Sequence, residues 1–454
     1  MSKRGVYFMQ SPTKLFTYFL PGLLCLFLSG CIVVPDQYSG LPPGPWRAVL
    51  KLDSRPVMPN PDGKPLPDKV NLQFEEVTAG ELPFTFEVIY DSEDEYHIEI
   101  INGSERIKLD QISLGRTPSR ARDTVRIDFP VFDTYVIAFY EENVIEGQWI
   151  SPNRGSDYTI PFVARHGRDH RFTTLRKEPM MDISGKWEVQ FEVETENPYK
   201  AVGEFVQEGN YLTGTFLTET GDYRYLEGTV QADKVYLSTF DGSHAFLFEA
   251  KILPDSTMIG SFQSGTHYRT TWEAKRNPDA TLISADSLTY IKEGYEGLSF
   301  SFPNTEGQMI SLSDEQYEGK VKILQVMGTW CPNCRDEVDF LLDFVENNKS
   351  EEIALIGLAF ERYKEEEKAL GAIRNYKKLM AIPHEMLWAG SSDKKEAATA
   401  LPMLNHILAF PTLIVLDKNN EVKWIHTGFA GPATSKYIDF KNKFDSVISE
   451  LIAN

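Results

Sequence analysis

The chain has 454 residues, of which 42% are hydrophobic and 25% charged, a composition typical of globular domains and not of disordered protein. Its 46 basic and 66 acidic side chains give a formal charge of −20, which argues against a duplex nucleic-acid binder because such proteins need a basic face. Four cysteines, at positions 25, 31, 331 and 334, are too few for a disulfide-stapled scaffold, and this length predicts roughly two to four domains.

Residues 1–30 have the pattern of a secretory signal. Basic residues precede an apolar run over 15–28, which a Pro-Gly pair interrupts and which is shorter than the roughly 20 residues of a membrane-spanning helix. The run ends in Leu-Ser-Gly-Cys at 28–31, which resembles the lipobox of bacterial lipoproteins. That resemblance implies lipidation of Cys31 and a lipid anchor in the bacterial cell envelope, with the periplasmic face of the outer membrane favoured. An ordinary signal or an uncleaved anchor is the alternative.

A proline-rich tether is expected over residues 31–68. Prolines, glycines and serines crowd residues 35–46, and five prolines lie between Pro56 and Pro67. Such a composition favours an extended linker. We therefore expect the first folded domain to begin near residue 69.

Residues 69–277 predict an all-β region. Short runs that alternate apolar and polar residues, such as FTFEVIY at 84–90 and TVRIDF at 124–129, are punctuated by Gly, Asp and Asn. This pattern is typical of antiparallel strands. We expect a sandwich or barrel, built as two β-rich units over 69–180 and 181–277.

An internal duplication is one interpretation of this β-rich region. The same features follow one another in residues 123–165 and in residues 233–276. Each segment has a strand, then a glycine two residues before an aromatic side chain, and then a final strand. The alternative is that unrelated amphipathic β-meanders look alike. The glycine-punctuated hairpins of the second unit resemble a small lipocalin-like barrel.

Residues 290–454 alternate strand-like and helical runs, which predicts an α/β domain with a parallel or mixed sheet. KVKILQVMG at 320–328 is nearly all apolar, as a strand buried on both faces should be. Thr-Trp-Cys-Pro-Asn-Cys follows at 329–334, and apolar residues then recur at helical spacing. Further expected elements are a hairpin of 298–302 with 309–311, a strand at 353–360, helices at 364–379 and 391–405, a hairpin of 411–417 with 421–426, and a terminal helix at 434–452.

The last two cysteines are expected where a buried strand meets the first turn of a helix. Unpaired amides carry partial positive charge there, so a thiolate is stabilised and its pKa falls. Cys331, at the front, would be the exposed nucleophile, and Cys334, one turn inward, could close a ring with it. Pro332 at an early helical position loses no needed hydrogen bond. Half of a zinc site is the alternative, but it needs two more Cys or His ligands.

Trp330-Cys331-Pro332-Asn333-Cys334 resembles the redox motif of the thioredoxin fold. The same resemblance extends to Leu-Ala-Phe-Pro-Thr at 408–412, which precedes an apolar strand. It implies that Pro411 is a cis-proline facing the cysteines, with Phe410 and Thr412 in the substrate groove. The hairpin before the motif and the long stretch before Pro411 resemble the TlpA/ResA-type branch, whose members are extracytoplasmic and membrane-tethered. The resemblance covers roughly residues 290–454.

Finer roles follow from that branch. Its members often place a glutamate three positions after the second cysteine, here Glu337, where a carboxylate can relay a proton and hold a cysteine pKa up. A solvated acid that favours the helix dipole is the alternative. Gln325 stands where thioredoxin itself has a buried aspartate, which puts deprotonation through that acid in doubt. Trp330 is expected to shield the motif, and Pro332 and Asn333 to tune its potential.

We therefore predict a membrane-anchored thiol-disulfide oxidoreductase that reduces extracytoplasmic protein disulfides with electrons from a membrane thiol donor. It needs no metal, flavin or nucleotide, because the Cys331–Cys334 pair is its redox group. The alternative is a binding lipoprotein whose β region captures a ligand or protein. A peroxiredoxin is less favoured, because the P-x3-T/S-x2-C signature would fall on Leu324 and Gly328. The histidines of His-Gly-Arg-Asp-His at 166–170 are expected in a polar turn and not at a metal site.

Overall fold

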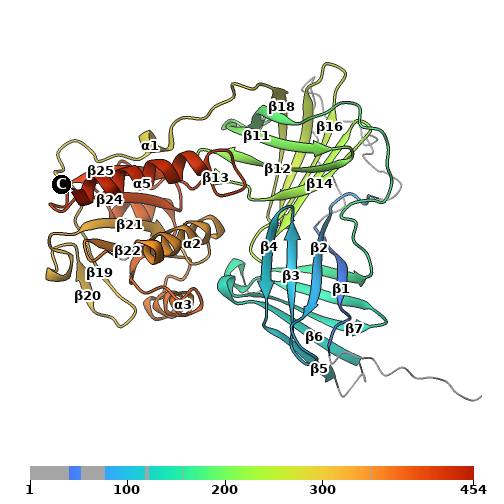
Figure 1. The fold of residues 1–454 in the computed structure, drawn as a ribbon, viewed down its shortest axis with the longest axis horizontal. Helices are drawn as coiled ribbons and strands as arrows, with labels where there is room; N and C mark the ends of the chain where they lie inside the picture. The colour runs from blue at the N-terminus through green and yellow to red at the C-terminus, as the bar shows by residue number, and fades with distance from the viewer. Residues whose placement is uncertain (1–39, 53–76, 118–121, 156, 349, 454) are drawn as a thin grey trace, which may run out of the picture. The chain divides into compact units, whose positions relative to one another are not determined.

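The computed structural model describes residues 40–52, 77–117, 122–155, 157–348 and 350–453 (Figure 1). The predicted signal, the lipidation candidate Cys31 and residues 53–76 lie outside the described residues. Gly40–Asn454 forms one compact unit. Within the described ranges, no helix is both long and apolar enough to cross a membrane.

The first β-rich unit is a nine-stranded antiparallel sheet with the strand order β4-β3-β2-β1-β9-β8-β7-β6-β5. Neighbours in sequence pair along β1 to β4 and along β5 to β9, β1 joins the two runs by pairing with β9, and β4 and β5 form the two edges. The strands are β1 (Gly44–Lys51), β2 (Glu81–Tyr90), β3 (Tyr96–Asn102), β4 (Glu105–Leu109), β5 (Ile112–Thr117), β6 (Arg122–Phe129), β7 (Thr134–Glu141), β8 (Val144–Ile150) and β9 (Thr159–His166).

Strand β1 corrects the expectation of a tether over residues 31–68. Trp46, Ala48 and Leu50 are fully buried and alternate with more exposed neighbours, as a strand with one buried face requires. The strand pairs over its whole length with β2 and over five residues with β9. This short strand was not recognised in the sequence for two reasons. Prolines flank it, as in a linker, and its pairing partners lie far along the chain.

The second β-rich unit is a closed barrel. Eight strands pair antiparallel in the order β11-β10-β18-β17-β16-β15-β14-β12, and β12 pairs again with β11. Aromatic side chains fill its interior, among them Phe191, Phe216, Phe248, Phe262 and Trp272. The strands are β10 (Gly185–Phe191), β11 (Tyr199–Glu208), β12 (Tyr211–Thr218), β14 (Leu226–Gln231), β15 (Lys234–Phe240), β16 (Ala245–Ile252), β17 (Met258–Ser264) and β18 (Tyr268–Arg276), with the short β13 (Gly221–Asp222) added to β12.

Both β-rich units begin with the same local structure, which favours the duplication interpretation. Gly44 and Gly185 have φ angles of +103° and +102°, a region that glycine adopts without strain. Two residues later, Trp46 and Trp187 are fully buried. Each donates its indole N–H to the carbonyl oxygen four residues earlier, over 3.1 and 2.8 Å. The last strand of each unit then pairs with its first strand.

Side chains of the second β-rich unit complete the hydrophobic core of the first, which includes Tyr236, Phe240, Ala245 and Leu247, whereas the barrel interior is a separate core. Phe240, from β15 of the second unit, lies 4.6 Å from Phe84 and 5.2 Å from Trp149 of the first, measured between ring centroids. Arg171 lies buried between the units, donating hydrogen bonds to the Asn102 side chain and to Ser238. Both units are therefore needed to complete this core.

The C-terminal domain is an α/β domain built on a five-stranded sheet with the order β23-β22-β21-β24-β25 (Figure 1). Strands β21 (Val321–Met327), β22 (Ile353–Glu361) and β23 (Glu385–Ser391) are parallel. Strand β24 (Thr412–Leu416) is antiparallel to β21, and β25 (Val422–Thr427) is antiparallel to β24. Helices α2 (Pro332–Asn347) and α5 (Tyr437–Ala453) pack on one face of the sheet. The hairpin of β19 (Ser301–Pro303) and β20 (Met309–Ser311) packs on the other.

The remaining helices are α1 (Ala285–Leu288), α3 (Glu366–Leu379) and α4 (Lys394–Ala400). The helix expected over 391–405 is therefore shorter than predicted, since the chain leaves helical geometry at Leu401. Strand β23 was not predicted, because its sequence EMLWAGS is short and lies between two helices.

Candidate active site around Cys331 and Cys334

The cysteine pair lies where β21 leads into α2. Cys331 is the N-cap of α2, and its Sγ accepts a hydrogen bond from the Cys334 amide over 3.1 Å. The two cysteines form a disulfide. Cys331 is 5% exposed and Cys334 is fully buried, so attack from outside can reach only the first sulfur. The amides at this helix end stabilise a thiolate on Cys331 when the disulfide is reduced.

The segment before β24 faces Cys331. The Phe410–Pro411 peptide is cis, as the sequence resemblance implied, and the carbonyl oxygen of Phe410 lies 3.4 Å from the Cys331 Sγ. Thr412 is buried, and its hydroxyl donates to the Ala409 carbonyl over 2.9 Å. The backbone at Phe410 is therefore placed beside the reacting sulfur.

Trp330 packs beside the cysteines. Its indole N–H donates to the Phe360 carbonyl over 3.0 Å, and its ring meets the Phe410 ring edge-on at 5.7 Å between centroids. On its other side, the Arg362 guanidinium lies 4.3 Å from the Trp330 ring centroid. Trp330 thus links Cys331 to the end of β22.

Glu337 is a buried acid of α2, one turn beyond Cys334. It is fully buried, which rules out the alternative of a solvated first-turn acid. The Gln325 side-chain amide donates both to Glu337 Oε2, over 2.9 Å, and to the Cys334 carbonyl, over 3.1 Å. Burial raises the pKa of Glu337 to about 8. At neutral pH it is therefore protonated, a state in which it can donate a proton to a departing thiolate.

A second buried acid, Glu361, was missed by the sequence interpretation. It ends β22, and its two carboxylate oxygens accept hydrogen bonds from the amide and the hydroxyl of Thr329, both over 2.9 Å. Burial raises the pKa of Glu361 to about 7. The signal available in the sequence was an acid at the end of an otherwise apolar strand. In the structure, Glu361 holds Thr329, the residue before Trp330, in position.

The β-rich region contacts the redox motif directly, which the sequence did not predict. Asn333, between the two cysteines, donates its side-chain amide to the Asp222 carbonyl of β13 over 3.2 Å. Arg224, just after β13, is buried and pairs with Asp336 of α2. Its other partners are Glu105 of the first unit, at 2.5 Å, and Asp241 of the second, at 3.2 Å. One guanidinium therefore joins both β-rich units to the helix that carries the cysteines.

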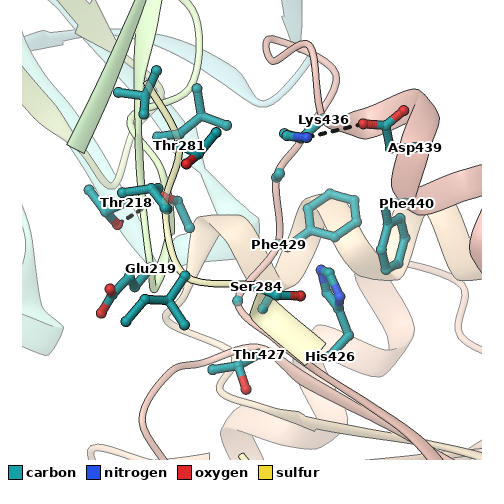
Figure 2. A pocket seen from close by; sticks show the side chains of 18 of the residues that line it. Thr218, Glu219, Thr281, Ser284, His426, Thr427, Phe429, Lys436, Asp439 and Phe440 are labelled. Atoms are coloured by element: carbon teal, nitrogen blue, oxygen red, sulfur yellow. Dashed lines mark hydrogen bonds and ion pairs between the residues drawn. The ribbon is translucent and has the colours of Figure 1, made fainter. Parts of the chain in front are cut away.

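A cavity of about 370 Å³ lies away from the cysteines, between the connection over 280–286 and the C-terminal domain (Figure 2). Figure 2 shows Thr218, Glu219 and Thr281 on one side of it and the rings of His426, Phe429 and Phe440 on the other. Asp286 anchors the connection, accepting hydrogen bonds from Trp424, His426 and Lys443. This cavity is lined by no cysteine, and residues 280–286 of the interdomain connection form part of its wall.

The histidines at 166 and 170 are not gathered with other metal ligands. His166 Nε2 lies 2.9 Å from the Pro43 carbonyl oxygen, and its ring packs 5.2 Å from that of Trp46. Among the residues that the structure describes, no group of three or more His, Cys, Asp or Glu side chains could hold a metal ion.

Known proteins match only part of this chain. Residues 294–425 match the model of the AhpC/TSA family. The thioredoxin-like protein YneN of Bacillus subtilis is 25% identical over 138 residues, which are 30% of this chain and 73% of that protein. A solved thiol:disulfide interchange protein of the thioredoxin family from Chlorobium tepidum is 22% identical, covering 36% of this chain and 99% of its own, with a TM-score of 0.27. A thiol-disulfide oxidoreductase from Bacteroides fragilis is 20% identical, covering 33% and 98%, with a TM-score of 0.25. The C-terminal region of this chain is therefore a thioredoxin-like domain that matches the AhpC/TSA family model, preceded by a large β-rich region.

Proposed function

We propose that this protein is a thiol-disulfide oxidoreductase that reduces protein disulfides outside the cytoplasm. The observation that carries the proposal is the Cys331–Cys334 disulfide at the N-terminus of α2, with the Phe410 carbonyl 3.4 Å from the outer sulfur. A strand-to-helix dithiol next to an extended backbone segment suits exchange with an extended disulfide-bearing chain.

The reaction proceeds in two exchanges. The Cys331 thiolate attacks one sulfur of the substrate disulfide, which breaks, and the other substrate sulfur leaves as a thiolate that takes up a proton. The Cys334 thiolate then attacks Cys331, forming the 331–334 disulfide and releasing the second substrate thiol. Two electrons pass from the protein dithiol to the substrate. When a donor thiol reduces this disulfide again, Cys334 leaves as a thiolate, and the protonated Glu337 supplies the proton that Cys334 takes up.

Cysteine variants test this activity. Reduced wild-type protein should reduce the disulfides of insulin catalytically with dithiothreitol, and Cys331→Ser should not. Cys334→Ser should accumulate a mixed disulfide through Cys331, because the resolving thiol is missing. Equal turnover in all three proteins would refute the proposal. Peroxide consumption that depends on Cys331 would instead favour a peroxidase.

The direction of electron flow is set by the reduction potential of the cysteine pair. A value below about −230 mV, close to thioredoxin, fits a reductase that needs a membrane thiol donor. A value above about −150 mV, towards the strong oxidants, would mean that the protein introduces disulfides.

The proposed location rests on the sequence pattern at the N-terminus. Cys31 would carry lipid and hold the protein in the bacterial envelope, so incorporation of labelled fatty acid should be lost in Cys31→Ala. Labelling that persists in this variant would contradict the lipoprotein assignment.

A further inference from the structure

A cavity of about 250 Å³ lies directly over Cys331. It is roofed by the β-rich region, because the loops after β12 and β15 and the turn after β8 all reach it. Its lining includes Trp330, Cys331, Asn333 and Phe410 of the C-terminal domain and Arg154, Thr220, Asp222 and His244 of the β-rich region. Sites for drug-sized ligands measure roughly 300–1,000 Å³. This cavity is smaller, so it has room only for the few groups that flank a reacting sulfur in a substrate.

Two arginines line this cavity from opposite sides of the domain boundary. Arg154 follows β8, and Arg362 follows β22. Arg154 is held in place by His267, whose Nε2 lies 2.9 Å away, and by the Ser243 carbonyl, 3.2 Å away. Arg362 stacks on Trp330, next to the nucleophilic cysteine. These contacts hold both guanidinium groups in position without neutralising their positive charges.

These two charges repel one another, and the acids that act on them, Glu361 on Arg362 and Asp241 on Arg154, form no ion pair with them. Burial, together with the neighbouring Arg154, lowers the pKa of Arg362 to about 10, so it remains charged at neutral pH. Burial lowers the pKa of His267 to about 4, which leaves this histidine neutral beside Arg154. Neither arginine forms an ion pair with a carboxylate in the part of the chain that the structure describes. A partly desolvated cation without a counter-charge favours binding of an anion.

The nearby acids are already engaged elsewhere. Asp222 lines the cavity, but its carboxylate accepts hydrogen bonds from the amides of Arg224 and Gly431, over 2.7 and 2.6 Å. Asp241 pairs with Arg224 and with His244. Glu361 turns both oxygens towards Thr329. Within the described residues, Arg154 and Arg362 therefore lie beside Cys331 without a paired carboxylate.

We propose that Arg154 and Arg362 bind a carboxylate that flanks the substrate disulfide, so that the protein selects carboxylate-bearing disulfides. This inference rests on the proposed exchange reaction and specifies its substrate class. The carboxylate pairs with the two guanidinium groups while the Cys331 thiolate attacks the adjacent sulfur. As in the proposed reaction, the substrate disulfide accepts two electrons from the Cys331–Cys334 dithiol. The carboxylate can belong to a small acidic thiol or to an acidic residue next to a cystine in a peptide.

Three small disulfides of similar size test the charge preference without any variant. Full-length protein, reduced with dithiothreitol and desalted, is mixed with 3,3′-dithiodipropionate, 2-hydroxyethyl disulfide or cystamine, which are dianionic, neutral and dicationic. Acid quenching, alkylation and mass spectrometry of the peptide with residues 331–334 give the rate of each exchange. The dianion should react at least about tenfold faster than the neutral disulfide, and cystamine slowest. Added salt should reduce this spread.

Variants then locate the preference. Arg154→Gln and Arg362→Gln should each lower the ratio of dianion to neutral rates about tenfold. A change in the Cys331 pKa would alter all three rates together and leave that ratio unchanged. Arg176→Gln, at an exposed arginine outside the cavity, is the matched control.

The outcomes separate the two proposals. If the dithiol reacts with none of the disulfides, the proposed function fails. If the three disulfides react at equal rates, or both variants keep the wild-type ratio, the carboxylate site is refuted while the exchange activity stands. The rates with oxidised glutathione and with a cystine peptide flanked by Glu or Gln are then compared. The faster of the two shows whether the substrate is a small disulfide or a peptide.

Discussion

Substituting Glu337 by glutamine should change how the stability of the protein depends on pH. Burial raises the pKa of this carboxyl from 4.5 to about 8. The unfolded chain therefore releases its proton near pH 4.5, whereas the folded protein retains it until about pH 8. Since the folded state binds the extra proton over this window, the free energy of unfolding falls as pH rises through it.

The magnitude follows from the width of that window. Each pKa unit corresponds to about 1.4 kcal/mol, so between pH 5 and pH 8 the wild-type protein should lose about 4 kcal/mol through Glu337 alone. Glu337→Gln removes this titration and can still accept the hydrogen bond from Gln325. The stability of the variant relative to wild type should therefore rise by about 4 kcal/mol between pH 5 and pH 8.

Urea unfolding of the oxidised protein at pH 5, 6, 7 and 8 measures this difference. Glu346→Gln, at an exposed acid of the same helix, is the matched control. A difference between E337Q and wild type that stays constant within about 1 kcal/mol over these pH values would refute the argument, because Glu337 would then be as well hydrated folded as unfolded.

Three further predictions concern the surroundings of the site. Arg224→Leu leaves three carboxylates without their buried cation, so it should cost about 3–5 kcal/mol at pH 7 and less at pH 4.5; equal losses at both pH values would contradict the ion-pair argument. A chain that starts at Gly40 should fold, whereas one that starts at Asp53 lacks β1 and should not give a cooperative thermal transition by circular dichroism. Glu361→Gln should raise stability relative to wild type between pH 5 and pH 8 by about 3 kcal/mol, because burial raises this pKa to about 7; urea unfolding at those pH values checks it.

The C-terminal domain was largely predictable because its signals are local. A buried apolar strand, a Cys-Pro-Asn-Cys motif and a helical spacing follow one another within 320–347. Pro411 could be assigned as a cis-proline only through the resemblance to a known fold, since no local feature distinguishes it from an ordinary proline at a strand start.

The missed features depend on contacts between distant parts of the chain. Alternating polarity predicted strands, but it could not show that β1 inserts between β2 and β9. Glu361 looks like an ordinary acid until its burial is known, and Glu337 was singled out only through the resemblance to a known branch. Arg224 gave no signal, because two of its three partners, Glu105 and Asp336, lie more than 100 residues away, one on each side in sequence.

The packing of the second β-rich unit against the first has a consequence for how the protein evolves. Phe240 completes the packing around Phe84 and Trp149, so a substitution in one unit changes the space that side chains of the other must fill. Neither unit can then be lost, exchanged or circularly permuted as a module without compensating substitutions in its neighbour. Whatever ancestral event produced two β-rich units with the same Gly-x-Trp start, the pair is now inherited as a single block, and selection on the redox site acts on all of it.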